Sequence, residues 1–257
     1  LTAGSHQLRF GVDYRRLQPA RTRSQTYFSV LADSVSEFLA KRNLWITQTP
    51  VAQMSNSLHE VSLYAQDTWR LSPRLTFTYG LRWEVNPPPI AAIPPTGLPS
   101  QPATEKPLWE LRYTNFAPRV GAAYRLTSDG RFILRSGFGL FYDSSLALAT
   151  DLITASTANL WQFASPAPDV TGASRTLLTY SFDPTLRLPL VREWNVTLER
   201  SLSADDVVSA GYIGANGTRL IRREIGGTES PNLIRAASAT NNGSSSYHSF
   251  QAHYRRR

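Results

Sequence analysis

Apolar and polar residues alternate with a period of two along several stretches of this chain. In the stretch 75–85 every odd position is apolar or aromatic, and every even position is polar, charged or glycine. Period two places successive side chains on opposite faces of a β-strand, so each such strand has one apolar and one polar face. The same alternation predicts strands at 7–15, 116–126, 59–71, 131–142, 191–202, 206–214 and 247–257.

The length of these strands also indicates the class of β-protein. Strands of soluble proteins usually have about five or six residues, whereas these have about ten or more. At roughly 3.3 Å per residue and a tilt of about 40°, ten residues climb about 25 Å, the height of the apolar band of an outer-membrane barrel. We therefore expect an all-β fold, an antiparallel transmembrane β-barrel segment of about eight long strands.

The predicted connections fall into two length classes. Short turns at 72–74, 127–130 and 203–206 carry the Pro, Asp, Gly and Ser that favour tight turns. The other connections are long: 17–58, 86–115, 143–190 and 215–246. Strict alternation of the two classes is typical of a membrane barrel with short periplasmic turns and long extracellular loops.

Three long connections have distinctive sequences. Residues 86–106 are rich in proline and predict an extended, irregular segment. Residues 241–246 are polar and predict a loop, whereas 30–40 has apolar residues at helical spacing and predicts a helix.

Aromatic residues gather near the predicted strand ends, as in the two aromatic belts of membrane barrels. Asp67 is the exception to the apolar pattern, because it shares a face with Leu63, Ala65 and Trp69; a bulge or an interfacial position would explain it. The girdle candidates are Tyr14, Trp83, Phe116, Tyr142, Trp194 and Tyr212 at the long-loop end, and Trp69, Tyr124 and Phe132 at the short-turn end.

The polar faces carry many arginines. Two interpretations remain open: pairing with Glu60, Glu84 or Glu199 inside the barrel, or attraction of an anionic substrate. The candidates for the lumen face are Arg9, Arg15, Arg82, Glu84, Arg119, Arg125 and Arg135.

Composition excludes several other functions. The net charge is +8, but the basic residues are dispersed along strands, so we expect no nucleic-acid partner. The chain has no cysteine, and its four histidines lie at no metal-ligand spacing. We expect no metal, no cofactor, no catalytic residues and no enzymatic activity.

Several motifs resemble one known family. The segments SLYAQDTWR (62–70), PRLT (73–76) and YGLRWE (79–84) resemble a hairpin of TonB-dependent receptor barrels, and are most similar to the Oar-like branch. Residues 115–121 and 134–143 resemble the next hairpin of that branch, and 4–11, 211–214 and 217–220 also fit. The resemblance spans most of the chain outside the long connections.

The resemblance implies a bacterial outer-membrane transporter with outer-membrane lipid around it, a plug domain inside it, and energy from the TonB system. Such barrels have about 22 strands, so we interpret residues 1–257 as a partial barrel without plug, TonB box or C-terminal strand. The ligand would be a siderophore, glycan, peptide or similar molecule. A passive porin or structural outer-membrane protein is the first alternative, and a soluble secreted β-sandwich binding module is the second.

Overall fold

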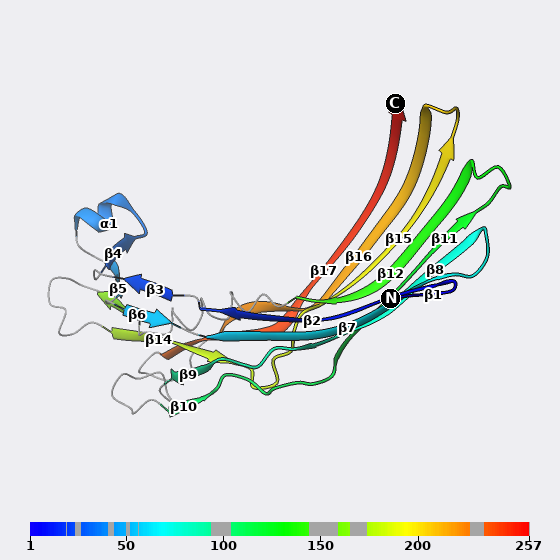
Figure 1. Ribbon diagram of the computed structural model, residues 1–257. Helices are drawn as coiled ribbons and strands as arrows, with labels where there is room; N and C mark the ends of the chain where they lie inside the picture. Colours follow the sequence, from blue (N-terminus) through cyan, green and yellow to red (C-terminus); the bar gives the residue numbers. More distant parts are fainter. Residues whose placement is uncertain are drawn as a thin grey trace.

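The computed structural model describes residues 1–18, 20–23, 27–40, 44–49, 52–55, 57–93, 104–143, 159–164, 174–226 and 234–256. Its dominant feature is one strongly curved, open sheet (Figure 1). Among the described residues no helix is long and apolar enough to cross a bilayer.

Eight long strands form the wall of this sheet, and they lie side by side in chain order. Each pairs antiparallel with the next, which confirms the predicted antiparallel architecture. A two-residue strand, β1 (Thr2–Ala3), borders the first of them. The wall strands are β2 (His6–Leu17), β7 (Leu58–Arg70), β8 (Leu75–Val85), β11 (Asn115–Arg125), β12 (Phe132–Tyr142), β15 (Leu190–Ser201), β16 (Asp206–Gly226) and β17 (Ile234–Arg256).

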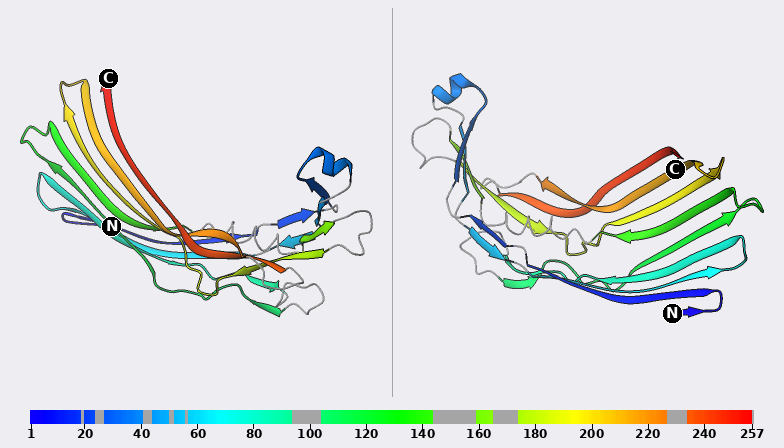
Figure 2. Two further views of the ribbon diagram at one scale, coloured as in Figure 1. Left: turned by 180° about the vertical axis from the view of Figure 1, so that it is seen from behind. Right: turned by 45° about the horizontal axis from the view of Figure 1, so that its top comes forward.

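The connections sort to the two ends of the wall as predicted. The tight turns after β7, β11 and β15 lie at one end, where both chain termini also lie, and the long connections lie at the other (Figure 2). In the turn between β11 and β12 the Asp129 carboxylate accepts hydrogen bonds from the Thr127 hydroxyl (2.6 Å) and the Arg131 N–H (3.1 Å). These two bonds lower the pKa of Asp129, because both stabilise its ionised form.

The long connections contain strands that the sequence did not predict. β14 (Ser174–Phe182) pairs in parallel with β17, and β13 (Asn159–Ala164), β5 (Leu44–Thr49) and β4 (Tyr27–Ala32) continue the sheet from there. Two separate hairpins pair β9 (Ile90–Ile93) with β10 (Thr104–Pro107), and β3 (Ala20–Arg23) with β6 (Ala52–Ser55). The irregular segment expected at 86–106 is therefore confirmed only at 86–89, which have no regular secondary structure, and is wrong at 90–93 and 104–106, which lie in strands.

The helix expected at 30–40 is shorter than predicted. α1 covers Val35–Leu39, and Ser34 caps it by accepting a hydrogen bond from the Glu37 N–H at 3.2 Å. Leu31 belongs instead to β4, where it pairs with Trp45 of β5. Strand pairing between two loop segments overrides the helical spacing there.

Strands β16 and β17 extend far beyond their predicted ends at 214 and 247. They have 21 and 23 residues, and they pair from Asp206↔Arg256 to Gly226↔Ala236. The polar segment 241–246, expected as a loop, is part of β17. It lacks alternation because a strand that continues beyond the apolar band has no apolar surroundings to select one face.

The register of the wall is staggered in the way a barrel requires. Trp69, Ala122 and Val196 lie on one row of cross-strand partners. The last residues of β7, β11 and β15 lie one, three and five residues beyond them, respectively. A shift of one residue (about 3.3 Å) for each strand spacing (about 4.8 Å) corresponds to a tilt of about 35°, close to that of closed barrels.

The wall has two chemically distinct faces, and its apolar face is uncovered. Phe10, Val12 and Phe250 are 68%, 72% and 74% exposed. A β-sandwich would bury such residues against a second sheet, so the soluble sandwich alternative is wrong. Cross-strand pairing from β2 to β11 places Val12, Leu63, Trp83 and Phe116 on the apolar face, and Asp13, Ser62, Glu84 and Asn115 on the polar face.

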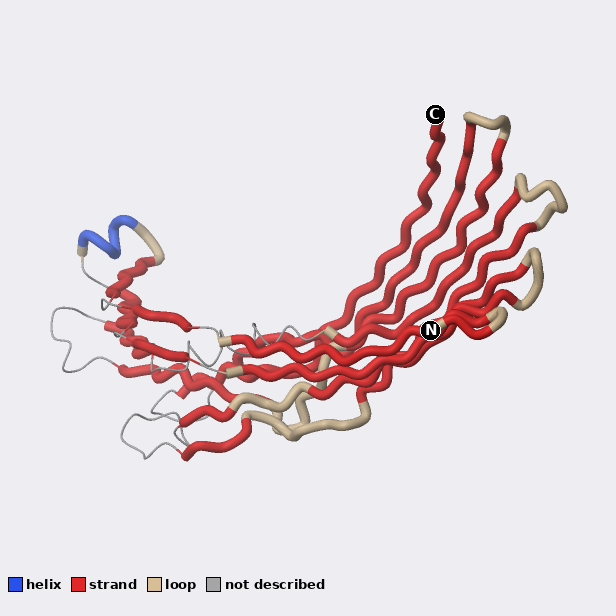
Figure 3. The backbone as a smooth tube through the Cα atoms, viewed as in Figure 1, coloured by secondary structure: helices blue, strands red, loops and turns tan. Residues whose placement is uncertain are grey.

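A small buried cluster lies where the long connections meet the wall. It joins Leu58 at the start of β7 to Leu108, Trp109, Leu186 and Leu188. The last four belong to connecting segments rather than strands, drawn as tan tube in Figure 3. This cluster fixes the connecting segments against the mouth of the wall.

Candidate functional site: the polar face of the wall

The cross-strand register places all seven lumen candidates on one face. Arg9 and Arg119 share a row through Gln66 and Gly80. Side chains an even number of residues apart along a strand point to the same face, and so do the side chains of cross-strand partners. By this rule the other five candidates share the face of Arg9 and Arg119. Those others are Arg15, Arg82, Glu84, Arg125 and Arg135.

An ion-pair network centres on Arg82. Its Nε lies 3.0 Å from Glu84 Oε1, and its Nη2 lies 3.4 Å from Asp13 Oδ2. Arg15 Nη2 lies 3.4 Å from the same oxygen of Asp13. The predicted pairing of arginine with Glu84 is confirmed, whereas Asp13 was missed although it alternates with the apolar residues of its strand.

The network borders a polar cavity of about 200 Å³ near the long-loop end of the wall. Three arginines and three carboxylates face it, so its charge is balanced by the chain itself. Its ionisable lining residues are Asp13, Arg15, Glu60, Arg82, Glu84 and Arg119, and Tyr142 completes one side.

Other arginines of the polar face form no direct ion pair with a carboxylate in the described part of the chain. Arg119 places its guanidinium 4.2 Å from the centre of the Phe141 ring, a cation–π contact. Arg9, Arg125 and Arg135 form no ion pair with another described residue. Arg125 and Arg135 are exposed, so they can contact a group that approaches this face.

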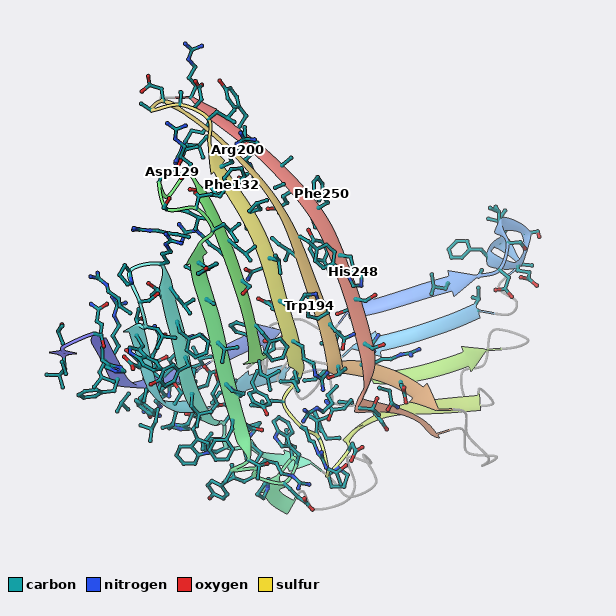
Figure 4. The ribbon with its side chains drawn as sticks, turned by 90° about the vertical axis from the view of Figure 1, so that its right-hand side faces the viewer. Asp129, Phe132, Trp194, Arg200, His248 and Phe250 are labelled. Atoms are coloured by element: carbon teal, nitrogen blue, oxygen red, sulfur yellow. The ribbon has the colours of Figure 1, made fainter. Side chains whose placement is uncertain are left out.

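The girdle candidates differ in how far they follow the prediction. Tyr14, Trp83 and Phe116 lie near the long-loop ends of their strands, and Trp69, Tyr124 and Phe132 near the short-turn ends. The Trp83 and Phe116 rings stack across strands with centroids 6.4 Å apart. Phe132 lies below the Arg200 guanidinium at 4.8 Å, close to the Asp129 turn (Figure 4).

The other three candidates have positions or contacts that the sequence did not predict. Tyr142 packs against the buried cluster and lines the polar cavity, so it belongs to the mouth of the wall. Tyr212 lies in the half of β16 nearer the short turns, because that strand continues to Gly226. Trp194 lies inside β15, where its ring meets His248 edge-on at 6.1 Å (Figure 4).

The apolar face accommodates Asp67 through hydrogen bonds. Asp67 is 4% exposed, and its Oδ2 lies 2.5 Å from His6 Nδ1 and accepts a bond from the Tyr79 hydroxyl at 2.9 Å. His6 in turn stacks on Trp69 with ring centroids 5.2 Å apart. The pairing of β7 with β8 is continuous through this point, so a bulge is not the explanation. Asp67 lies three residues from the short-turn end of β7, close to where an interface would be.

The described residues contain no group of three or more His, Cys, Asp or Glu side chains that could hold a metal ion.

A two-faced, staggered wall of long strands with connections sorted by length defines an outer-membrane β-barrel. The whole chain, residues 1–257, matches the family model described as "Outer membrane beta barrel domain", and the chain belongs to that family. It therefore lies in the bacterial outer membrane, with its short turns on the periplasmic side and its long loops on the extracellular side.

Solved structures with a similar fold include two outer-membrane proteins. The outer membrane transporter YddB from Escherichia coli is 15% identical with a TM-score of 0.63, over 99% of this chain and 28% of that one. The ferric enterobactin receptor PfeA is 12% identical with a TM-score of 0.50, over 96% of this chain and 33% of that one. The chain thus spans a third or less of either relative. No curated protein matches the chain.

These likenesses confirm the resemblance to the barrels of TonB-dependent transporters at the level of the fold. At such low identity they carry no information on ligand, and membership of the Oar-like branch stays a prediction.

Proposed function

We propose that this chain forms part of the wall of a TonB-dependent uptake transporter and takes part in no catalytic step. The observation that carries the proposal is the polar face, where Arg9, Arg125 and Arg135 have no carboxylate partner among the described residues. A wall with a purely structural interior would pair its charges within itself, as the Arg82 network does. Unpaired arginines favour contact with another component that enters the lumen.

The two faces of the wall have different roles because they contact different surroundings. The apolar face contacts outer-membrane lipid, and the ladder of backbone hydrogen bonds keeps polar main-chain groups out of the hydrocarbon. The Arg82–Asp13–Glu84 network links β2 to β8 across the intervening strand β7 on the polar face. The unpaired arginines are placed to bind carboxylates of a plug domain or an anionic ligand, because guanidinium groups form strong paired hydrogen bonds with such groups.

The ligand of this transporter would be a siderophore, a glycan, a peptide or a similar molecule. Energy would come from the inner membrane through TonB to the plug. A passive porin is the remaining alternative, and it predicts entry that needs no energy source.

Uptake by the full-length protein distinguishes the two. We expect uptake of a labelled panel (ferric siderophores, oligosaccharides and peptides) in cells with functional TonB, and loss of that uptake in TonB-deficient cells. Replacing both Arg125 and Arg135 with glutamine should reduce uptake, whereas Arg74→Gln in a periplasmic turn should leave it unchanged. A passive pore would be established instead if uptake persisted in TonB-deficient cells and was the same in the arginine variants as in the unmodified protein.

A further inference from the structure

A second cavity lies beside the balanced one at the extracellular end of the wall. Tyr142 lines both cavities, which makes them neighbours. The second has a volume of about 130 Å³, room for about four water molecules at roughly 30 Å³ each. Its lining residues are Arg112, Thr114, Asn115, Tyr142, Arg187 and Arg219.

The three arginines come from separate segments that the fold holds together. Arg112 precedes β11, Arg187 precedes β15, and Arg219 lies in β16. The side chain of Asn241 in β17 joins two of them: its Nδ2 donates to the carbonyls of Arg187 (2.9 Å) and Arg219 (2.6 Å). Its Oδ1 accepts from the Arg187 N–H at 2.6 Å. One amide group thus fixes the backbone at two corners of the cavity.

The backbone at Arg219 is strained. Its φ of 58° is the left-handed conformation that favours glycine, and the β16–β17 register shifts at this point. A non-glycine residue in that conformation costs free energy and persists where surrounding contacts hold it, often at binding sites. Here the bond from Asn241 to the Arg219 carbonyl is one such contact.

The charge of this cavity differs from that of its neighbour. The first cavity balances three arginines with three carboxylates, whereas the lining of the second contains three arginines and no carboxylate. Glu110 pairs with Arg112 Nη2 at 2.7 Å from outside that lining. The buried Nε of Arg112 has no hydrogen-bond partner in the described part of the chain, and Arg187 and Arg219 form no ion pair there. Guanidinium groups stay charged at any physiological pH, so the lining of the second cavity keeps its net positive charge.

We propose that this cavity binds an oxyanion group, a phosphate, sulfate or carboxylate, at the extracellular mouth of the barrel. Guanidinium groups present paired N–H donors that match the oxygens of such a group, and the Thr114 hydroxyl adds a further donor. The group belongs either to a water-soluble ligand or to the phosphates of lipopolysaccharide in the outer leaflet. The site stands independently of the transport mechanism, because binding is measurable without transport.

Calorimetric titration of the full-length protein in detergent with inorganic phosphate tests the site. We expect saturable binding at one site. Arg187→Gln and Arg219→Gln should each weaken it about tenfold or more, since a hydrogen bond to a charged group accounts for a change of that size. Arg74→Gln, in the periplasmic turn after β7, is the matched control and should bind phosphate normally. Arg187 has an exposed side chain, so its variant should fold, which heat-modifiable gel mobility checks.

A competition arm identifies the source of the group. Displacement of phosphate by lipopolysaccharide, but not by its dephosphorylated form, assigns the site to the lipid; failure of lipopolysaccharide to compete assigns it to a soluble ligand. Absence of saturable phosphate binding in the unmodified protein would overturn the proposal. So would an equal loss in Arg187→Gln and Arg74→Gln, since binding would then depend on net charge alone.

Discussion

At the scale of single residues, the wall tolerates polar groups on its apolar face when a neighbouring strand supplies a partner. His6 and Tyr79 bind Asp67 from the two strands beside it, and the Tyr212 hydroxyl binds His248 Nδ1 at 2.6 Å. The sequence pattern identifies Asp67 as an exception, but period two contains no information about which residues lie opposite it. Such partners follow from register, which a single strand does not encode.

We predict that His6→Ala destabilises the folded protein, because the buried Asp67 carboxylate then loses its closest partner. The double variant His6→Leu, Asp67→Leu should recover most of this loss, since it removes both polar groups at once. Urea-induced unfolding of the full-length protein in lipid bilayers measures both effects. If the double variant were less stable than His6→Ala, the His6–Asp67 pair would stabilise the fold by more than satisfying its own two polar groups.

At the scale of elements, the sequence predicted the wall strands and short turns well and the long connections poorly. Between β7 and β15 the apolar band imposes alternation, so the ends of β8, β11 and β12 were predicted to within a residue or two. In the loops, strands such as β9 and β10 are stabilised by pairing with each other, which leaves no periodic signal. The second cavity was also missed, because its arginines lie in segments expected to be loops.

Two glycines of the wall provide a matched test of strand packing. A Cβ on Gly80 would lie 2.9 Å from the backbone oxygen of Ala65, which cannot move without separating β7 from β8. A Cβ on Gly121 would meet nothing closer than 3.4 Å. We predict that Gly80→Ala costs about 1–3 kcal/mol of unfolding free energy, as overpacking does. Gly121→Ala should be neutral or stabilise by about 0.5 kcal/mol.

Urea unfolding followed by tryptophan fluorescence measures both glycine variants. Equal effects at the two positions would mean that β7 and β8 do not approach as closely as their pairing indicates.

At the scale of the whole molecule, three independent features indicate the wall of a β-barrel. A shift of one residue per strand, an apolar face left uncovered across the wall, and short turns gathered at one end are each expected of a barrel wall. Family membership over residues 1–257 and the fold of YddB support the same conclusion. What the wall transports is a separate matter, decided by residues at its mouth and on its polar face.

The central claim is that the apolar face contacts lipid and the polar face contacts the lumen. Single cysteines in the full-length protein, which has none within these 257 residues, can be labelled in intact membranes with a reagent confined to the bilayer. We predict labelling at Leu8, Phe77, Leu81, Ala122 and Leu134, and protection at Thr78 and Ala123, which lie one residue along the strand from labelled positions. Labelling at Thr78 and Ala123 with protection at the other five would contradict the account, because it would reverse the two faces of the wall.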